Sequence, residues 1–148
     1  MRLVIQRVTQ ASVTIDGTIH GEISRGLVVL IGIESEDADD DIDWLVQKLV
    51  NMRIFSDSEG KMNLSLTDVD GALLVISQFT LFASTKKGNR PGFTKSAPPA
   101  FAIPLYERFI YLCRKHALVA TGQFGADMKV SLVNDGPVTI LIDSKNRE

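Results

Sequence analysis

The order of apolar and polar residues predicts a hairpin at the start of the chain. Residues 3–15 alternate between the two types, as expected for a strand with one buried face, with a bend near Gln10. Asp16-Gly17 predicts a turn, because aspartate and glycine accept the backbone angles of tight hairpins. Residues 18–23 are then expected to form the returning strand.

Two later segments are apolar throughout. Residues 26–34 and 71–83 have the composition of central strands covered on both faces. Between them, the acidic stretch at 34–43 is typical of a helix start, where carboxylates interact favourably with the helix dipole. The helix that follows has one apolar face with helical spacing, made of Ile42, Leu45, Val46, Leu49 and Met52.

A second helix is predicted over residues 102–117. Its apolar side consists of Leu105, Phe109, Leu112 and Cys113. The expected fold class is α+β, with a mostly antiparallel sheet, two main helices and a single domain over residues 1–148.

The segment Lys129–Asp143 raises a question of its own. Two strand-like runs flank the letters NDGP, and proline cannot donate a hydrogen bond to a sheet. One interpretation is the turn of an ordinary hairpin. The other is that the Gly136-Pro137 peptide is itself a functional element, and these residues alone leave both open.

Composition and charge limit the kinds of binding partner that are expected. The chain has 148 residues and a net charge of −2, whereas a protein that neutralises the phosphates of a long duplex is usually basic. A short footprint, such as a single nucleotide end, is compatible with this charge. No membrane span or secretory signal is visible, and Cys113 is the single cysteine, so a cytoplasmic protein is expected.

The sequence lacks the residue patterns of several common phosphate-binding and metal-binding sites. The loop at 84–99 contains GNRPGFTK, which is one residue short of a phosphate-binding P-loop. His20 and His116 have no neighbouring zinc ligands at the usual spacing, and the acidic stretch lacks the frame of a calcium loop. We therefore expect no metal and no cofactor, while a loop of this length is often functional.

The letters SQFT, at 77–80, place three hydrogen-bonding side chains around one aromatic ring at the end of an apolar run. Serine and threonine are also common on the faces of strands, so a purely structural role is the alternative. Without a neighbouring base, Thr80 is a weak nucleophile.

These segments together resemble the D-aminoacyl-tRNA deacylase family. Two signatures of that family, SQFTL and NDGPVT, are intact. Similar segments occur in the same order along almost the whole chain, namely MRLVIQRV, MRIFSDSEGKMNLSL, KGNRPGF, APP, LYE and TGQFGADM. One segment, DVDG in place of DVGG, departs from the family pattern, and it lies outside both signatures.

The resemblance implies a fold, a substrate and an oligomeric state. The fold would be a β-barrel-like α+β domain that forms a homodimer, with two composite sites at the subunit interface. The substrate would be the aminoacylated tRNA 3′ end, and the reaction would be hydrolysis of the ester to a D-amino acid or to mischarged glycine. Gly136 and Pro137, joined by a cis peptide, would enter the partner's site and exclude L-amino acids by steric clash.

The resemblance also assigns roles to single residues. Phe124 and Met128 would line an adenine pocket, with Ala102 as a further substrate-binding residue, although the same residues also suit a core. Arg7 would hold the Gly-Pro loop, and its alternative is a surface arginine. Ser77, Gln78, Phe79 and Thr80 form the implied catalytic group.

Two mechanisms and three functions follow from these assignments. In one mechanism Thr80 attacks the ester. In the favoured one, backbone N–H groups near Phe79 stabilise the oxyanion and the 2′-hydroxyl of the terminal ribose helps to activate water. The alternatives to a deacylase are a non-catalytic protein that binds the tRNA 3′ end and a small-molecule hydrolase that uses Thr80.

Overall fold

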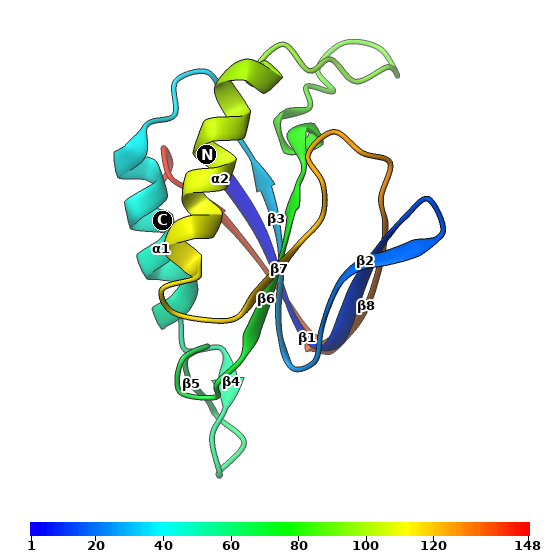
Figure 1. Cartoon of the computed structure of the whole chain (residues 1–148). Coiled ribbons are helices and arrows are strands. Elements are labelled where there is room, and N and C mark those ends of the chain that lie inside the picture. Colours follow the sequence, from blue (N-terminus) through cyan, green and yellow to red (C-terminus); the bar gives the residue numbers. More distant parts are fainter.

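The computed structural model describes residues 1–148, and in it a sheet wraps around one side of the molecule while two helices cover the other (Figure 1). The helices are α1 (Asp39–Asn51) and α2 (Pro99–Cys113), and a short 3-10 helix, η1, spans Phe79–Phe82. The strands are β1 (Arg2–Ile15), β2 (Thr18–Ile23), β3 (Gly26–Gly32), β4 (Phe55–Ser56), β5 (Met62–Leu64), β6 (Ala72–Ser77), β7 (Val119–Thr121) and β8 (Lys129–Asp143).

Strand β1 organises the sheet because it pairs with three others. Its first half pairs with β3, its second half with β2, and its whole length with β8, all antiparallel. The register against β8 shifts around residues 6–10, where the sequence predicted a bend. Strands β3, β6 and β7 are parallel to one another, so the sheet is mixed although most of its pairs are antiparallel.

The two ends of the strand order approach each other and give the sheet its barrel-like shape. In the order β2-β1-β3-β6-β7, the outer strands β2 and β7 meet again across the barrel. The His20 ring donates a hydrogen bond from Nδ1 to the Thr121 carbonyl at 2.9 Å. Gly21 permits this approach, because a Cβ there would lie 2.9 Å from the same carbonyl oxygen.

Two cores lie on opposite faces of the sheet. The larger one fills the space between the sheet and both helices, and the smaller one lies inside the curled part formed by β1, β2, β6 and β8. Helix α1 begins at the acidic stretch as predicted, and its apolar face is buried except for the half-buried Met52. Neither helix has the length and apolar character needed to cross a membrane.

Helix α2 differs from the prediction in its boundaries and in its buried face. It starts at Pro99, a residue whose fixed φ suits the first helical position, and ends at Cys113. The prediction placed both limits too late. The buried face is turned by about one residue from the predicted one, since Leu105 and Leu112 are half-buried while the fully buried positions are Ala102, Tyr106, Phe109, Ile110 and Cys113.

The C-terminal segment is one continuous strand, and the hairpin interpretation of NDGP is wrong. Gln6 pairs with Thr139 and Val8 with Asn134, so residues 135–138 stand opposite the single residue Arg7. The extra residues form a protrusion from β8, and the Gly136-Pro137 peptide within it is cis.

Asp70, the residue that departs from the family pattern, has a φ of 49°, a conformation that glycine adopts more easily.

Candidate active site

A pocket of about 270 Å³ lies beside the end of β6, next to the start of α2. It is mostly apolar, and two of its walls come from segments far apart in the sequence. Six of the predicted site residues line it, namely Ser77, Gln78, Phe79, Ala102, Phe124 and Met128. The remaining lining residues are Ile31, Ile33, Ile76, Ala97, Gly125, Ala126 and Val130.

The SQFT segment changes from strand to 3-10 helix inside this site. Ser77 is the last residue of β6, and the Gln78 N–H donates to the Ile31 carbonyl at 2.7 Å. The first hydrogen bond of η1 runs from the Leu81 N–H to the Gln78 carbonyl at 3.2 Å, so the N–H groups of Phe79 and Thr80 precede it. Gly32 makes room for this turn, because a Cβ there would lie 2.9 Å from the Leu81 Cβ.

Side chains from the 84–96 loop fix the position of Phe79. The Phe79 ring packs edge-on against Phe93 with a centroid distance of 5.1 Å, although 56% of Phe79 remains exposed. The Ser96 hydroxyl donates to the Phe79 carbonyl at 2.9 Å. The Gln78 side-chain amide donates to the Thr80 hydroxyl, so this hydroxyl is oriented by an amide and not by a base.

The opposite wall is built on Phe124 and Met128. Phe124 packs edge-on against Tyr106 of α2 with a centroid distance of 5.8 Å, and the Tyr106 hydroxyl donates to the Val75 carbonyl at 3.1 Å. Burial raises the pKa of Tyr106 to about 12, so this tyrosine is a neutral support for the wall. Gly122 leaves space for Met128, since a Cβ there would lie 2.3 Å from the Met128 sulfur.

Arg7, Gly136 and Pro137 form a second group, away from this pocket. Arg7 pairs with Leu27 and Ser77 with Ile31, so the two groups are separated by four residues along β3, about 13 Å at ~3.3 Å per residue. Gly136 and Pro137 are exposed at the surface of the chain. A single chain therefore brings six of the predicted residues together at the pocket, with Thr80 directly adjoining, and leaves these three apart.

The protrusion on β8 is held from beneath by Arg7 and Asn134. Arg7 is 7% exposed, and it donates from Nη1 to the Ile54 carbonyl at 2.6 Å and from Nε to the Asp135 carbonyl at 3.1 Å. Asn134 donates to the carbonyls of Arg7 and Val138 at 2.9 and 3.0 Å. Gly136 has a φ of 128° and packs on the guanidinium, since a Cβ there would lie 3.0 Å from Arg7 Nη2.

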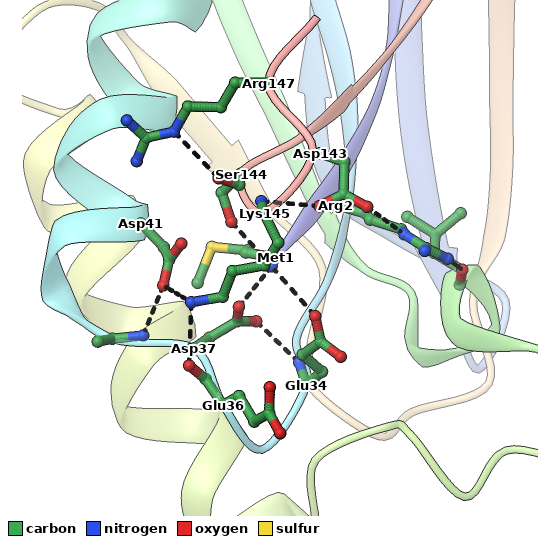
Figure 2. Close-up of polar contacts among 12 residues, drawn as sticks. Met1, Arg2, Glu34, Glu36, Asp37, Asp41, Asp143, Ser144, Lys145 and Arg147 are labelled. Carbon is green, nitrogen blue, oxygen red and sulfur yellow. Dashed lines mark hydrogen bonds and ion pairs between the residues drawn. The ribbon is translucent and has the colours of Figure 1, made fainter.

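A polar cluster at the ends of β1 and β8 supports the other side of η1 (Figure 2). Asp37 accepts hydrogen bonds from the Met1 amine and, at 2.8 Å, from the Glu34 N–H. Arg2 donates from Nε to Asp143 at 2.8 Å and from Nη1 to the Leu81 carbonyl at 3.0 Å. Arg2 thereby joins the end of β8 to the turn that carries Phe79 and Thr80.

No general base stands beside Thr80. His20 lies on β2 with its ring bound to Thr121, and His116 follows the end of α2. Cys113 is buried in the core, and burial raises the pKa of its thiol to about 12, so it is no nucleophile. No group of three or more histidine, cysteine, aspartate or glutamate residues could hold a metal ion.

Several residues that support the site were not predicted from the sequence. Phe93 and Ser96 lie in the loop that the sequence marked as functional, so its length was the available signal. Asn134 belongs to the NDGPVT signature, but its role depends on the course of β8 around the protrusion, which the residues alone left open between a hairpin turn and a functional element. Arg2 gave no signal, because its contact with η1 joins residues that are 79 positions apart.

Comparison with known proteins places the chain in a family. The family model described as D-Tyr-tRNA(Tyr) deacylase matches residues 4–143. Curated D-aminoacyl-tRNA deacylases from Flavobacterium johnsoniae and Bacteroides fragilis are each 59% identical to the chain over 150 residues, with 100% of both sequences covered. The protein is thus a hydrolase of the class that acts on ester bonds. Within this class, the chain belongs to the D-aminoacyl-tRNA deacylase family.

Solved structures agree on the fold. The structure of a c-Myc DNA unwinding element binding protein has a TM-score of 0.91 and 41% identity, covering 97% of this chain and 98% of that one. A structure described as a probable eukaryotic D-amino acid tRNA deacylase has a TM-score of 0.82 at 19% identity, covering 95% and 97%. The predicted α+β class with a barrel-like sheet and two helices is confirmed.

Proposed function

We propose that the protein hydrolyses the ester between a D-amino acid, or mischarged glycine, and the terminal adenosine of tRNA. The observation that carries the proposal is the pocket beside β6. It combines a flat aromatic ring and a thioether, Phe124 and Met128, with the turn at Phe79. Aromatic and sulfur-containing surfaces suit a nucleobase, and a turn with available N–H groups suits a developing oxyanion.

The selection of D-amino acids is assigned to Gly136 and Pro137 of a second subunit. In one chain these residues are exposed and lie away from the pocket, while Arg7 and Asn134 hold their backbone in place. Carbonyl oxygens on such a rigid protrusion can accept hydrogen bonds from the substrate ammonium group. An L side chain would collide with the protrusion, whereas a D side chain points away and glycine has none.

A homodimer supplies that second subunit. Strand β8 pairs only with β1, so its other edge has unpaired backbone groups, and Leu141 on this strand is 65% exposed. A groove of about 1020 Å³ follows the same edge and includes Leu81, two residues after Phe79. Because a two-fold interface is reciprocal, a copy packed against this edge would complete both sites at once.

In the proposed mechanism the protein positions the ester and stabilises charge. The N–H groups of Phe79 and Thr80 would bind the oxyanion, and the 2′-hydroxyl of the terminal ribose would assist water. Ser77 and Gln78 would hold the turn and the ribose. Nucleophilic attack by Thr80 is less favoured, because its hydroxyl accepts a hydrogen bond from an amide and has no base beside it.

A release assay separates this function from its two alternatives. The purified protein is mixed with D-tyrosyl-tRNA, L-tyrosyl-tRNA and glycyl-tRNA, and the loss of each ester is followed. Cleavage of the D-form and the glycyl form, with the L-form intact, is the expected result. Binding without release would instead indicate a tRNA-end binding protein, and hydrolysis of small esters regardless of RNA would indicate a Thr80-dependent hydrolase.

A further inference from the structure

The loop between η1 and α2 carries an isolated positive patch. Residues 84–96 contain four basic residues and no acidic one, in a chain whose net charge is −2. All four are exposed, and none forms an ion pair with an acidic group of the chain. The basic loop, as we call it, thus bears Lys86, Lys87, Arg90 and Lys95.

The basic loop has a defined shape and a defined place. Ser84 and Gly92 exchange two backbone hydrogen bonds, of 2.7 and 2.9 Å, which close the loop at its base. From there it extends beyond the sheet, near the start of α2 (Figure 1). Its second half is joined to the site, because Phe93 packs on the Phe79 ring and Ser96 donates to the Phe79 carbonyl.

We propose that the basic loop binds the phosphates of the unpaired 3′ end of tRNA, directly next to the ester in the pocket. This inference rests on the proposed function, since the pocket would hold the terminal adenosine and its exposed lining residue Phe79 packs against Phe93 of the basic loop. Each nucleotide carries one negative phosphate, and lysine and arginine bind phosphates by charge. Four unpaired cations at that point offset the repulsion expected from an acidic protein.

The strength of the effect can be stated in advance. For a single strand, the logarithm of affinity falls with the logarithm of salt with a slope of about −0.7 per phosphate contact. Between 50 and 200 mM salt, two contacts therefore weaken binding about 7-fold and four contacts about 50-fold. A solvated loop without RNA contacts would add nothing to this dependence.

The test compares two double variants with the same change in charge. The first is Lys86→Glu with Lys87→Glu in the basic loop. The control is Lys61→Glu with Lys115→Glu, which are exposed, lie in the β4–β5 hairpin and after α2, and do not line the pocket. Each protein is given D-tyrosyl-tRNA and D-tyrosyl-adenosine, the latter being the same ester without any phosphate.

The loop variant should have a KM for D-tyrosyl-tRNA at least about 10-fold above the control, with a salt slope shallower by about 1.4 than that of the wild type. Its kcat/KM for D-tyrosyl-adenosine should match the control. Equal KM values and equal salt slopes in the two variants would overturn the proposal. Equal losses on both substrates would also overturn it, because the loop would then act only by supporting the site.

A failure of the proposed function gives a different pattern. If the wild-type protein cleaves neither ester, the function is wrong, and uncharged tRNA then tests the loop by itself. A Kd for uncharged tRNA that is about 10-fold weaker in the loop variant than in the control would still support phosphate binding. The same Kd in both variants would overturn it.

Discussion

Thr80 is the residue at which the two mechanisms can be separated. Its hydroxyl accepts one hydrogen bond, from Gln78, and loss of such a bond costs about 0.5–1.5 kcal/mol. Thr80→Ala should therefore lower the rate of D-tyrosyl-tRNA cleavage roughly tenfold at most. Replacing the terminal 2′-hydroxyl of the tRNA by hydrogen should be far more damaging. Two results together would contradict this mechanism. The Thr80→Ala protein would be folded and dimeric but inactive, and the wild-type protein would still cleave the 2′-deoxy tRNA well.

Arg7 determines whether the Gly136-Pro137 protrusion is held in a working position. Arg7→Ala removes its bonds to the carbonyls of Ile54 and Asp135, and hydrogen bonds to charged groups contribute about 1.5–3 kcal/mol each. We expect a loss of D-tyrosyl-tRNA turnover of at least about 10-fold, with the dimer still present by sedimentation. Arg53→Ala is the matched control, because Arg53 is exposed and directly precedes Ile54 in the chain. Turnover at the wild-type rate in Arg7→Ala would contradict this prediction and indicate that Arg7 has only a structural role.

At the level of elements, the sequence predicted what depends on periodicity. The alternation of β1 and the turn at Asp16-Gly17 identified the first hairpin almost to the residue, and the apolar spacing of α1 identified its buried face, although the helix ends at Asn51 and not near Phe55 as the sequence suggested. The course of β8 was less predictable, since Asp-Gly before proline is typical of a hairpin turn and the partner strand decides whether the chain turns back. Here β1 pairs with both halves of β8, which forces residues 135–138 outward.

The pocket was predictable only in part for the same reason. SQFT and FGADM indicated residues on both walls, but the closeness of the walls depends on where β6 and the segment after β7 lie in the sheet. Gly32 and Gly122 make space in the site, but they have no side chain from which such a role could be predicted. The contacts of Arg2 and Ser96 with η1 are also long-range, so no local pattern contains them.

The junction between α1 and the C-terminal segment should make folding stability sensitive to acid. Burial raises the pKa of Asp41, but hydrogen bonds from Lys145, Ser144 and the Ala38 N–H outweigh it, so its pKa lies below 3.8. A carboxylate with a lowered pKa stabilises the fold above its unfolded pKa, and this contribution is lost as the pH falls through the folded value. The urea-unfolding free energy of the wild type should therefore fall below pH 3.8, and that of Asp41→Asn should fall less. Parallel pH curves for the two proteins would contradict this origin.

At the scale of the whole molecule, a composite site requires a dimer formed along the β8 edge. Leu141→Asp places a charge on this edge and should give a folded monomer without deacylase activity, because neither site would receive its protrusion. Leu118→Asp is the control, since Leu118 is 71% exposed and does not line the groove beside β8. Sedimentation, circular dichroism and the release assay together check the prediction. A Leu141→Asp protein that is monomeric and active would contradict this prediction.

The most direct test of a composite site is complementation between two inactive proteins. Pro137→Lys alters the exposed protrusion, and Phe79→Asp alters the exposed turn of the pocket, so both variants should fold, dimerise and lack activity. After unfolding and refolding together in equal amounts, half of the dimers should be mixed, and one of the two sites in each mixed dimer would be built from intact halves. About a quarter of the wild-type activity on D-tyrosyl-tRNA should therefore be recovered. If refolding yields mixed dimers but no activity returns, the site is not shared between two subunits.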